Sequence, residues 1–164
     1  MLRKISMLLL LAGAVISASS VPATVFPSTA PSSEQRSDQF VAEIRAVIQA
    51  QQEAWNRGDI DGFMNGYARS KSTIFVSEDT VTRGWQTVRD RYKKKYSDRA
   101  KMGTLKFSDL EITPLGADSA VALGRWKLKR TKDQPHGRFT LIFRKTADGW
   151  RIVHDHTSAA AAPR

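Results

Sequence analysis

The sequence predicts a single α+β domain in which three helices come first and an antiparallel sheet follows. Up to residue 103 the apolar residues recur mostly at helical steps of three and four. Beyond Thr104 they alternate with polar residues, in segments that turns separate. The chain of 164 residues is long enough for one ordinary core but hardly for two. Its 41% of hydrophobic and 26% of charged residues are typical of a folded domain.

The N-terminus has the residue order of a secretory signal peptide. Arg3 and Lys4 precede an apolar run over residues 5–16, and small residues follow it. This run is shorter than the roughly 20 residues that span a bilayer. The alternative to a signal peptide is a buried N-terminal helix. We expect a signal peptide over 1–23, a flexible linker over 24–36, the domain over 37–158 and a tail over 159–164.

Export implies a periplasmic or secreted protein without a stable membrane anchor once the signal is removed. The chain has no cysteine, which excludes a disulfide scaffold, a thiolate zinc site and a cysteine nucleophile. Its net charge of +10 makes acidic partners worth considering, but we expect no nucleic-acid partner because no base-stacking motif appears.

Helical spacing predicts a long helix over residues 40–55, started by a cap at Ser33 or Ser37 and stopped by Gly58. Asp59 is placed to cap a second, shorter helix that runs to Tyr67. A small hairpin is expected over 73–83. The third helix follows Gly84 and carries an aromatic stripe: Trp85, Tyr92 and Tyr96.

Four strands are expected after Thr104, over residues 105–112, 120–130, 139–143 and 150–157. In the first of these the apolar phase changes, which indicates a β-bulge near Ser108 and Asp109. Short turns with Pro, Gly or Asp separate the strands, so we expect a meander of antiparallel neighbours.

This order of elements, together with several local segments, resembles the nuclear transport factor 2-like superfamily, also called SnoaL-like. The resemblance covers residues 39–158 and is closest to exported bacterial members that are domains of unknown function. The segments that carry it are Ala-Trp-Asn-Arg-Gly-Asp-Ile-Asp-Gly-Phe at 54–63, Arg-Gly-Trp at 83–85, Gly-Arg-Trp at 124–126, Gly-Arg-Phe-Thr-Leu at 137–141 and Gly-Trp-Arg-Ile-Val-His-Asp-His-Thr-Ser at 149–158.

The resemblance implies a cystatin-like, nuclear transport factor 2-like cone, in which three N-terminal helices pack on a curved, mostly antiparallel sheet and leave one deep pocket. It also implies a homodimer through the sheet. Members include ketosteroid isomerases, dehydratases, polyketide cyclases and plain binding modules, so the fold alone does not assign a reaction. The isomerases place a base aspartate shortly after the pair that matches Tyr67-Ala68, but here residues 72–76 contain no carboxylate.

His154 and His156 are the candidate acid–base residues. In a regular strand they share a face with Trp150 and Ile152, so we expect them to border the pocket, with Asp155 on the other face. The alternative is that they are hydrogen-bonded within the sheet and hold the C-terminal strand in place, or that they face a dimer partner. Two histidines without a third ligand do not predict a metal site, and we expect no cofactor.

Five large aromatic residues are candidates for binding a flat apolar ligand. They are Trp55, Tyr67, Trp85, Tyr92 and Trp126. Core packing is the alternative, and both roles are compatible where a pocket wall is also the core. A basic cluster over residues 89–101 indicates either an anion-binding surface or a solvated helix face.

Two functions follow from these candidates, and an assembly or interaction domain that works through the sheet face is a third alternative. The first is a binding domain that holds a small apolar or aromatic molecule without turnover. The second is a cofactor-free lyase, isomerase or cyclase in which His154 or His156 moves a proton and Tyr67 or Tyr92 stabilises an oxyanion.

Overall fold

The structure is a computed structural model that describes residues 32–161. The expected signal peptide, most of the expected linker and the last three residues of the expected tail lie outside the described residues. No helix within the described range is both long and apolar enough to cross a membrane.

The first helix, α1 (Ser33–Asn56), begins earlier than the sequence indicated. The Ser32 hydroxyl accepts a 3.1 Å hydrogen bond from the Gln35 backbone N–H, and the Gln35 side chain accepts one from the Ser32 N–H. This capping box satisfies free N–H groups at the helix start. The predicted caps, Ser33 and Ser37, therefore lie inside the helix, and residues 33–36 form its first turn rather than the end of a linker.

The other helices are α2 (Ile60–Met64), α3 (Trp85–Lys95) and α4 (Arg99–Met102). Asp59 caps α2 as expected, through a 2.7 Å bond from the Gly62 N–H. The sequence pattern did not predict α4, because four residues are too few to show a helical period. Asp98 caps this helix by accepting the Lys101 N–H.

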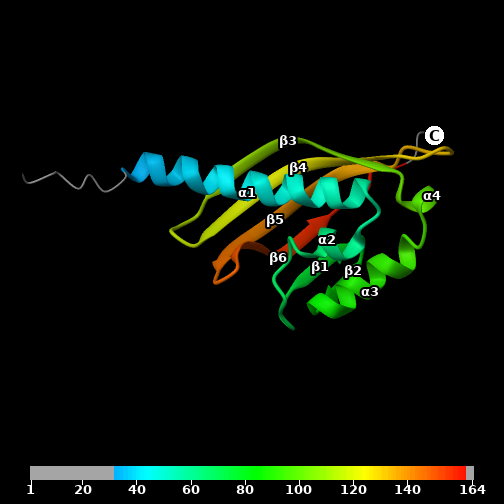
Figure 1. Cartoon of the computed structure of the whole chain (residues 1–164), viewed down its shortest axis with the longest axis horizontal. Coiled ribbons are helices and arrows are strands. Elements are labelled where there is room, and N and C mark those ends of the chain that lie inside the picture. Colours follow the sequence, from blue (N-terminus) through cyan, green and yellow to red (C-terminus); the bar gives the residue numbers. More distant parts are fainter. Residues whose placement is uncertain (1–31, 162–164) are drawn as a thin grey trace, which may run out of the picture. The chain divides into compact units, whose positions relative to one another are not determined.

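One sheet of six strands contains both the hairpin and the meander. Its strands are β1 (Ile74–Ser77), β2 (Thr80–Arg83), β3 (Thr104–Pro114), β4 (Ser119–Lys129), β5 (His136–Thr146) and β6 (Gly149–Thr157). Their order is β2-β1-β6-β5-β4-β3; β1 and β6 are parallel, and all other neighbours are antiparallel. The sheet curves beneath α1 (Figure 1). The predicted α+β class, with N-terminal helices on a curved and mostly antiparallel sheet, is confirmed.

Side chains of α1 bind the backbone of β3, which forms one edge of the sheet. Gln52 Oε1 accepts the Phe107 N–H at 2.6 Å, and Asn56 exchanges two bonds with the Leu105 backbone. An open strand edge leaves backbone groups without partners. These amides therefore protect the edge and fix α1 in register with the sheet.

Two bulges shape the strands. The predicted bulge in β3 is confirmed: the pairing with β4 shifts between Ser108 and Glu111, and Asp109 takes a left-handed φ of 52°. A second bulge, in β6, was not predicted. Ile152 pairs with Phe143 of β5 while His154 pairs with the adjacent Ile142, so Val153 is the extra residue. The side-chain phase of β6 reverses at this point.

Candidate functional site

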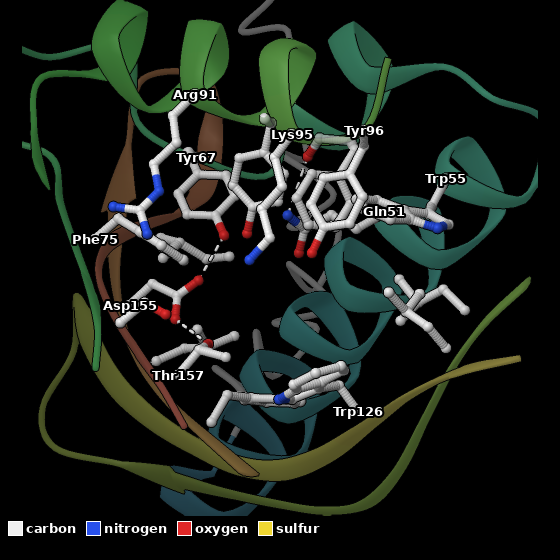
Figure 2. A pocket seen from close by; sticks show the side chains of 18 of the residues that line it. Gln51, Trp55, Tyr67, Phe75, Arg91, Lys95, Tyr96, Trp126, Asp155 and Thr157 are labelled. Atoms are coloured by element: carbon white, nitrogen blue, oxygen red, sulfur yellow. Dashed lines mark hydrogen bonds between the residues drawn. The ribbon is translucent and has the colours of Figure 1, made fainter. Parts of the chain in front are cut away.

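A cavity of about 130 Å³ lies between the inner face of the sheet, α1 and α3 (Figure 2). Most of its wall is aromatic or aliphatic. The polar groups of the lining come from Gln51, Asp155 and Thr157 on its inner side, and from Arg91, Lys95 and Glu78 among others. The aromatic residues of the wall are Trp55, Phe63, Tyr67, Phe75, Tyr92, Tyr96, Phe107, Trp126 and Phe139.

Tyr92 is at the centre of the aromatic packing. Its ring centroid lies 5.2 Å from that of Phe63, 5.6 Å from Phe75, 5.9 Å from Tyr96 and 6.1 Å from Trp55. Most of these pairs are tilted or edge-to-face, the arrangement that the ring quadrupoles favour. The rings therefore support one another while their free surfaces line the cavity, so the same residues form part of the core and part of the cavity wall.

Asp155 is a buried carboxyl group on the cavity wall, with 3% of its surface exposed. The Tyr67 hydroxyl donates to its Oδ2 at 2.6 Å, and the Thr157 hydroxyl donates to its Oδ1 at 2.6 Å. Figure 2 shows both bonds. A carboxylate oxygen has two lone-pair sites, so each oxygen retains the capacity to accept a bond from a ligand.

The backbone holds Tyr67 beside β6. The Ala68 N–H donates to Ile152 O, and the Ile152 N–H donates to Gly66 O, both at 2.9 Å. These bonds place Tyr67 alongside the strand just before the bulge at Val153. The bulge then turns Asp155 to the same side as Ile152, so the strand and this short segment together create the Tyr67–Asp155 contact.

Burial raises the pKa of Asp155 to about 6, and the hydrogen bonds from Thr157 and Tyr67 oppose that rise. Phe75 lies opposite Asp155 across the parallel β1–β6 pair and supplies no compensating charge. Burial and the neighbouring Asp155 raise the pKa values of Tyr67 and Tyr92 well above the ordinary value. A carboxyl group with a pKa near 6 is suited to accept and return a proton at neutral pH.

The predicted position of the two histidines is wrong. His154 and His156 do not line the cavity, because the bulge at Val153 moves them to the other face of the sheet. His156 is exposed and His154 is half-buried. Strict alternation of side chains from Trp150 and Ile152 predicted that His154 and His156 face inward and Asp155 outward, which is the opposite of what the structure shows. No turn residue marks Val153 in the sequence, so the pattern contained no signal for the bulge that makes Asp155 the buried polar residue.

Four of the five predicted aromatic residues line the cavity: Trp55, Tyr67, Tyr92 and Trp126. Trp85 does not. It lies seven residues before Tyr92, about 10 Å away along the helix axis, and its Nε1 donates to Met64 O at 3.0 Å. The guanidinium groups of Arg69 and Arg89 lie over its ring, with distances of 4.9 and 5.8 Å to the centroid.

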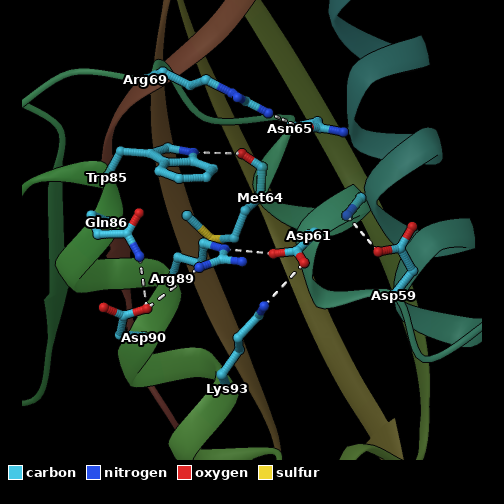
Figure 3. Close-up of polar contacts among 11 residues, drawn as sticks. Asp59, Asp61, Met64, Asn65, Arg69, Trp85, Gln86, Arg89, Asp90 and Lys93 are labelled. Carbon is cyan, nitrogen blue, oxygen red and sulfur yellow. Dashed lines mark hydrogen bonds and ion pairs between the residues drawn. The ribbon is translucent and has the colours of Figure 1, made fainter.

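Most of the basic cluster is engaged within the fold. Asp61 binds Arg89 at 2.5 Å and Lys93 at 3.0 Å (Figure 3). These two cations lower the pKa of Asp61 to about 2. Further along the chain, Lys101 lies 3.3 Å from Asp98, and the Arg99 guanidinium donates to Trp55 O. Several of these cations are therefore held by contacts within the fold, and Arg91 and Lys95 line the cavity.

Across residues 32–161, no three His, Cys, Asp or Glu side chains are grouped so that they could hold a metal ion. The C-terminal segment contributes to the cavity although we expected a tail from residue 159. Ala159 lines the cavity, Trp126 Nε1 donates to Ser158 O at 2.9 Å, and the Ala160 N–H donates to His136 O.

The family model described as a SnoaL-like domain matches residues 44–162. Among solved structures, an NTF-2 like protein of unknown function from Shewanella oneidensis MR-1 is similar to this chain at 41% identity. The alignment covers 72% of this chain and 98% of that chain, with a TM-score of 0.69. No curated protein matches the sequence.

Two more distant structures have the same fold. An NTF2-like protein of unknown function from Pseudomonas putida KT2440 is 20% identical over 77% of this chain and 90% of its own, with a TM-score of 0.66. A ketosteroid isomerase-like protein from Erwinia carotovora atroseptica SCRI1043 is 19% identical over 76% of this chain and 99% of its own, with a TM-score of 0.61. At these identities the likeness concerns the fold alone.

Proposed function

Since the chain belongs to the SnoaL-like family of NTF2-like proteins, we propose that it binds a small apolar or aromatic molecule in the cavity beneath α3. The observation that carries this proposal is the cavity of about 130 Å³ with aromatic walls and a single buried carboxyl group. An engineered apolar cavity of about 150 Å³ is large enough for benzene. The ligand part that enters is therefore about the size of one six-membered ring.

Calorimetry and protein NMR test this function with a small panel: toluene, phenol, benzyl alcohol and cyclohexanol, with glycerol as the polar control. We expect at least one ring compound to bind and to shift the resonances of Tyr67, Tyr92 and Trp126. A pair of variants at the C-terminal segment locates the site. Ala159→Trp places a bulky ring on the cavity lining and weakens binding, whereas Ala160→Trp, one residue further, leaves it unchanged. Failure of every ring compound to bind contradicts the proposal.

An acid–base enzyme is the second candidate, and the raised pKa of Asp155 favours it. His154 and His156 face away from the cavity, so Asp155 takes the proton-transfer role that we first assigned to them. The Asp155 carboxylate would remove a proton from carbon next to a carbonyl group, and the electron pair would move to the carbonyl oxygen. The Tyr67 hydroxyl is already donated to Asp155, so Tyr92 is the phenol assigned to the resulting oxyanion.

Deuterium exchange tests this second candidate without knowledge of the substrate. Phenylacetone in D₂O is followed by NMR, and the wild-type protein is expected to accelerate exchange of its α-protons above the buffer rate. Asp155→Asn abolishes the acceleration, whereas the double variant His154→Gln/His156→Gln retains it. If exchange proceeds at the buffer rate in every sample while ligand binding is intact, the acid–base enzyme is contradicted and the binding function is retained.

We also propose that the protein is exported to the periplasm or secreted, because of the residue order at 1–16. Mass spectrometry of the protein recovered from cell fractions tests this, with loss of the first 18 to 23 residues as the expected result.

The homodimer through the sheet stays a prediction, and light scattering of the mature protein tests whether a dimer forms.

A further inference from the structure

Arg91 and Lys95 of α3 are the two cations of the basic cluster that line the cavity. Arg89 and Lys93 bind Asp61, and Lys101 binds Asp98. Within residues 32–161, none of the ion pairs involves Arg91 or Lys95. Both of them line the cavity. Lys94 and Arg99 form no ion pair within residues 32–161 either, but they do not line this cavity, so Arg91 and Lys95 are the unpaired cations of the cluster that the fold places at the cavity.

These two side chains have defined positions. Arg91 Nη1 donates to Thr82 Oγ1 at 2.9 Å, and its guanidinium lies 5.3 Å from the centroid of the Phe75 ring, which is part of the wall. Lys95 lies four residues later on the same face of α3, with its Nζ 5.6 Å from the Tyr96 ring. Figure 2 shows both side chains reaching from α3 toward the cavity.

The cavity has electrical polarity along its depth. Lys95 is exposed and Arg91 is half-buried, so the cations lie at the mouth, while the carboxyl group of Asp155 is 3% exposed. Glu78 also lines the cavity, and its negative charge offsets one of the two cations, so the mouth carries one net positive charge. An anionic group placed deep in the cavity would meet the like charge of Asp155 in a poorly solvated site. At the mouth it would meet Lys95 and Arg91.

We infer that the ligand class is a compact apolar or aromatic acid, with its ring inside the cavity and its carboxylate at the mouth against Lys95 and Arg91. This inference rests on the proposed binding function and adds the charge and orientation of the ligand. Arginine is suited to a carboxylate because its planar donors match the two oxygens. The Arg91 guanidinium is held in place by Thr82 and Phe75, so little side-chain entropy is lost on binding.

Calorimetry with three molecules of equal carbon skeleton tests the charge preference: 3-phenylpropionate, 3-phenylpropan-1-ol and 3-phenylpropylamine. We expect the acid to bind about tenfold more tightly than the alcohol, because the acid adds charge-assisted bonds, and the amine to bind most weakly. The preference for the acid falls as salt concentration rises, because the mouth is exposed to solvent.

Matched variants assign the preference to the mouth. Lys95→Gln and Arg91→Gln each reduce the affinity for 3-phenylpropionate but not for the alcohol, whereas Lys94→Gln, the adjacent exposed lysine that does not line the cavity, changes neither. Glu78→Gln strengthens binding of the acid. Urea unfolding of each variant establishes that it is folded before binding is measured.

The outcomes distinguish the preference for an acid from the proposed binding of apolar rings. If the alcohol binds as tightly as the acid, the cavity binds apolar rings and the charge inference is wrong. If Lys94→Gln loses as much acid affinity as Lys95→Gln, the attraction belongs to the whole basic helix, and the inference is again wrong. If none of the three molecules binds and the uncharged ring panel also fails, the proposed function itself is overturned.

Discussion

The hydroxyl group of Tyr67 donates a 2.6 Å hydrogen bond to Oδ2 of Asp155, a residue 88 positions later in the chain. Both residues are buried and both line the same cavity. A hydrogen bond to a buried carboxylate stabilises the ionised form, against the desolvation that raises the pKa of Asp155 to about 6. The properties of the site therefore depend on this contact.

Replacement of Tyr67 by Phe removes the donor and keeps the ring. Asp155 then loses one of the bonds that lower its pKa, so its pKa rises above 6. The unfolding free energy falls by about 1–3 kcal/mol at pH 8, where the carboxylate would be left short of a partner, and by less at pH 4.5, where the group is neutral. NMR titration of Asp155 and urea unfolding measure the two effects. Tyr96→Phe, another phenol on the cavity wall, is the control and leaves the pKa of Asp155 near 6.

Asp155 makes the stability of the folded chain depend on pH. Its pKa is about 6 when folded and near the ordinary 3.8 when unfolded, so the folded state binds the proton more tightly. Its contribution is most favourable below pH 4, is lost as the pH rises from 4 to 6, and levels off above that range. The total change is at most about 3 kcal/mol.

Asp155→Asn removes this pH dependence. The unfolding free energy of the wild type relative to the variant is expected to fall between pH 4 and pH 7, measured by urea unfolding at several pH values. The comparison cancels the contributions of Asp61 and Asp98, whose pKa values are lowered and whose pH dependence has the opposite sign. A difference that stays constant with pH would show that Asp155 does not titrate in this range.

A midpoint near pH 6 in a ligand-binding or exchange profile would ordinarily be assigned to a histidine, whose unperturbed pKa is about 6.5. Here we expect the double variant His154→Gln/His156→Gln to retain a midpoint, because both side chains lie outside the cavity, and to move it upward, because the charge of His156 lowers the pKa of Asp155. Asp155→Asn removes it. Loss of the midpoint in the histidine variant alone would return the acid–base role to the histidines.

Gln52 is expected to stabilise the edge of the sheet. Gln52→Ala leaves the Phe107 N–H without its 2.6 Å acceptor and costs about 1 kcal/mol of unfolding free energy. Gln49→Ala, in the same helix, removes only an exposed bond to Glu53 and has a much smaller effect. Urea unfolding compares the two variants, and equal losses would contradict the role of Gln52 at the edge.

The regular elements other than the four-residue α4 could be predicted from the sequence, because hydrophobic periods and turn residues mark them. The aromatic spacing of Tyr92 and Tyr96 placed α3, and the change of phase at Ser108 and Asp109 located the bulge in β3. That bulge was visible because apolar residues mark the phase on both sides of it, at Phe107 and at Leu110. The family resemblance and the fold class then followed from the order of the elements.

The polar centre of the site could not be predicted in the same way. After Val153, β6 continues with His154, Asp155 and His156, and no large apolar residue marks which of them turns inward. One extra residue reverses the assignment of all three. Trp85 was wrongly assigned to the cavity for a different reason. Helical spacing predicts which face of the helix a residue lies on, but it does not predict which part of the protein packs against each turn of that face.

The last strand of the described residues, β6, occupies an interior place in the sheet, between β5 and the parallel β1. The hairpin and the meander can therefore be joined only after β6 is available to pair with both, and until then each exposes an unpaired strand edge. Asp155 enters its apolar surroundings only at that final step. Premature termination anywhere before residue 149 would remove the bridge between the two parts of the sheet, so such fragments should aggregate or be degraded rather than persist as partly active protein.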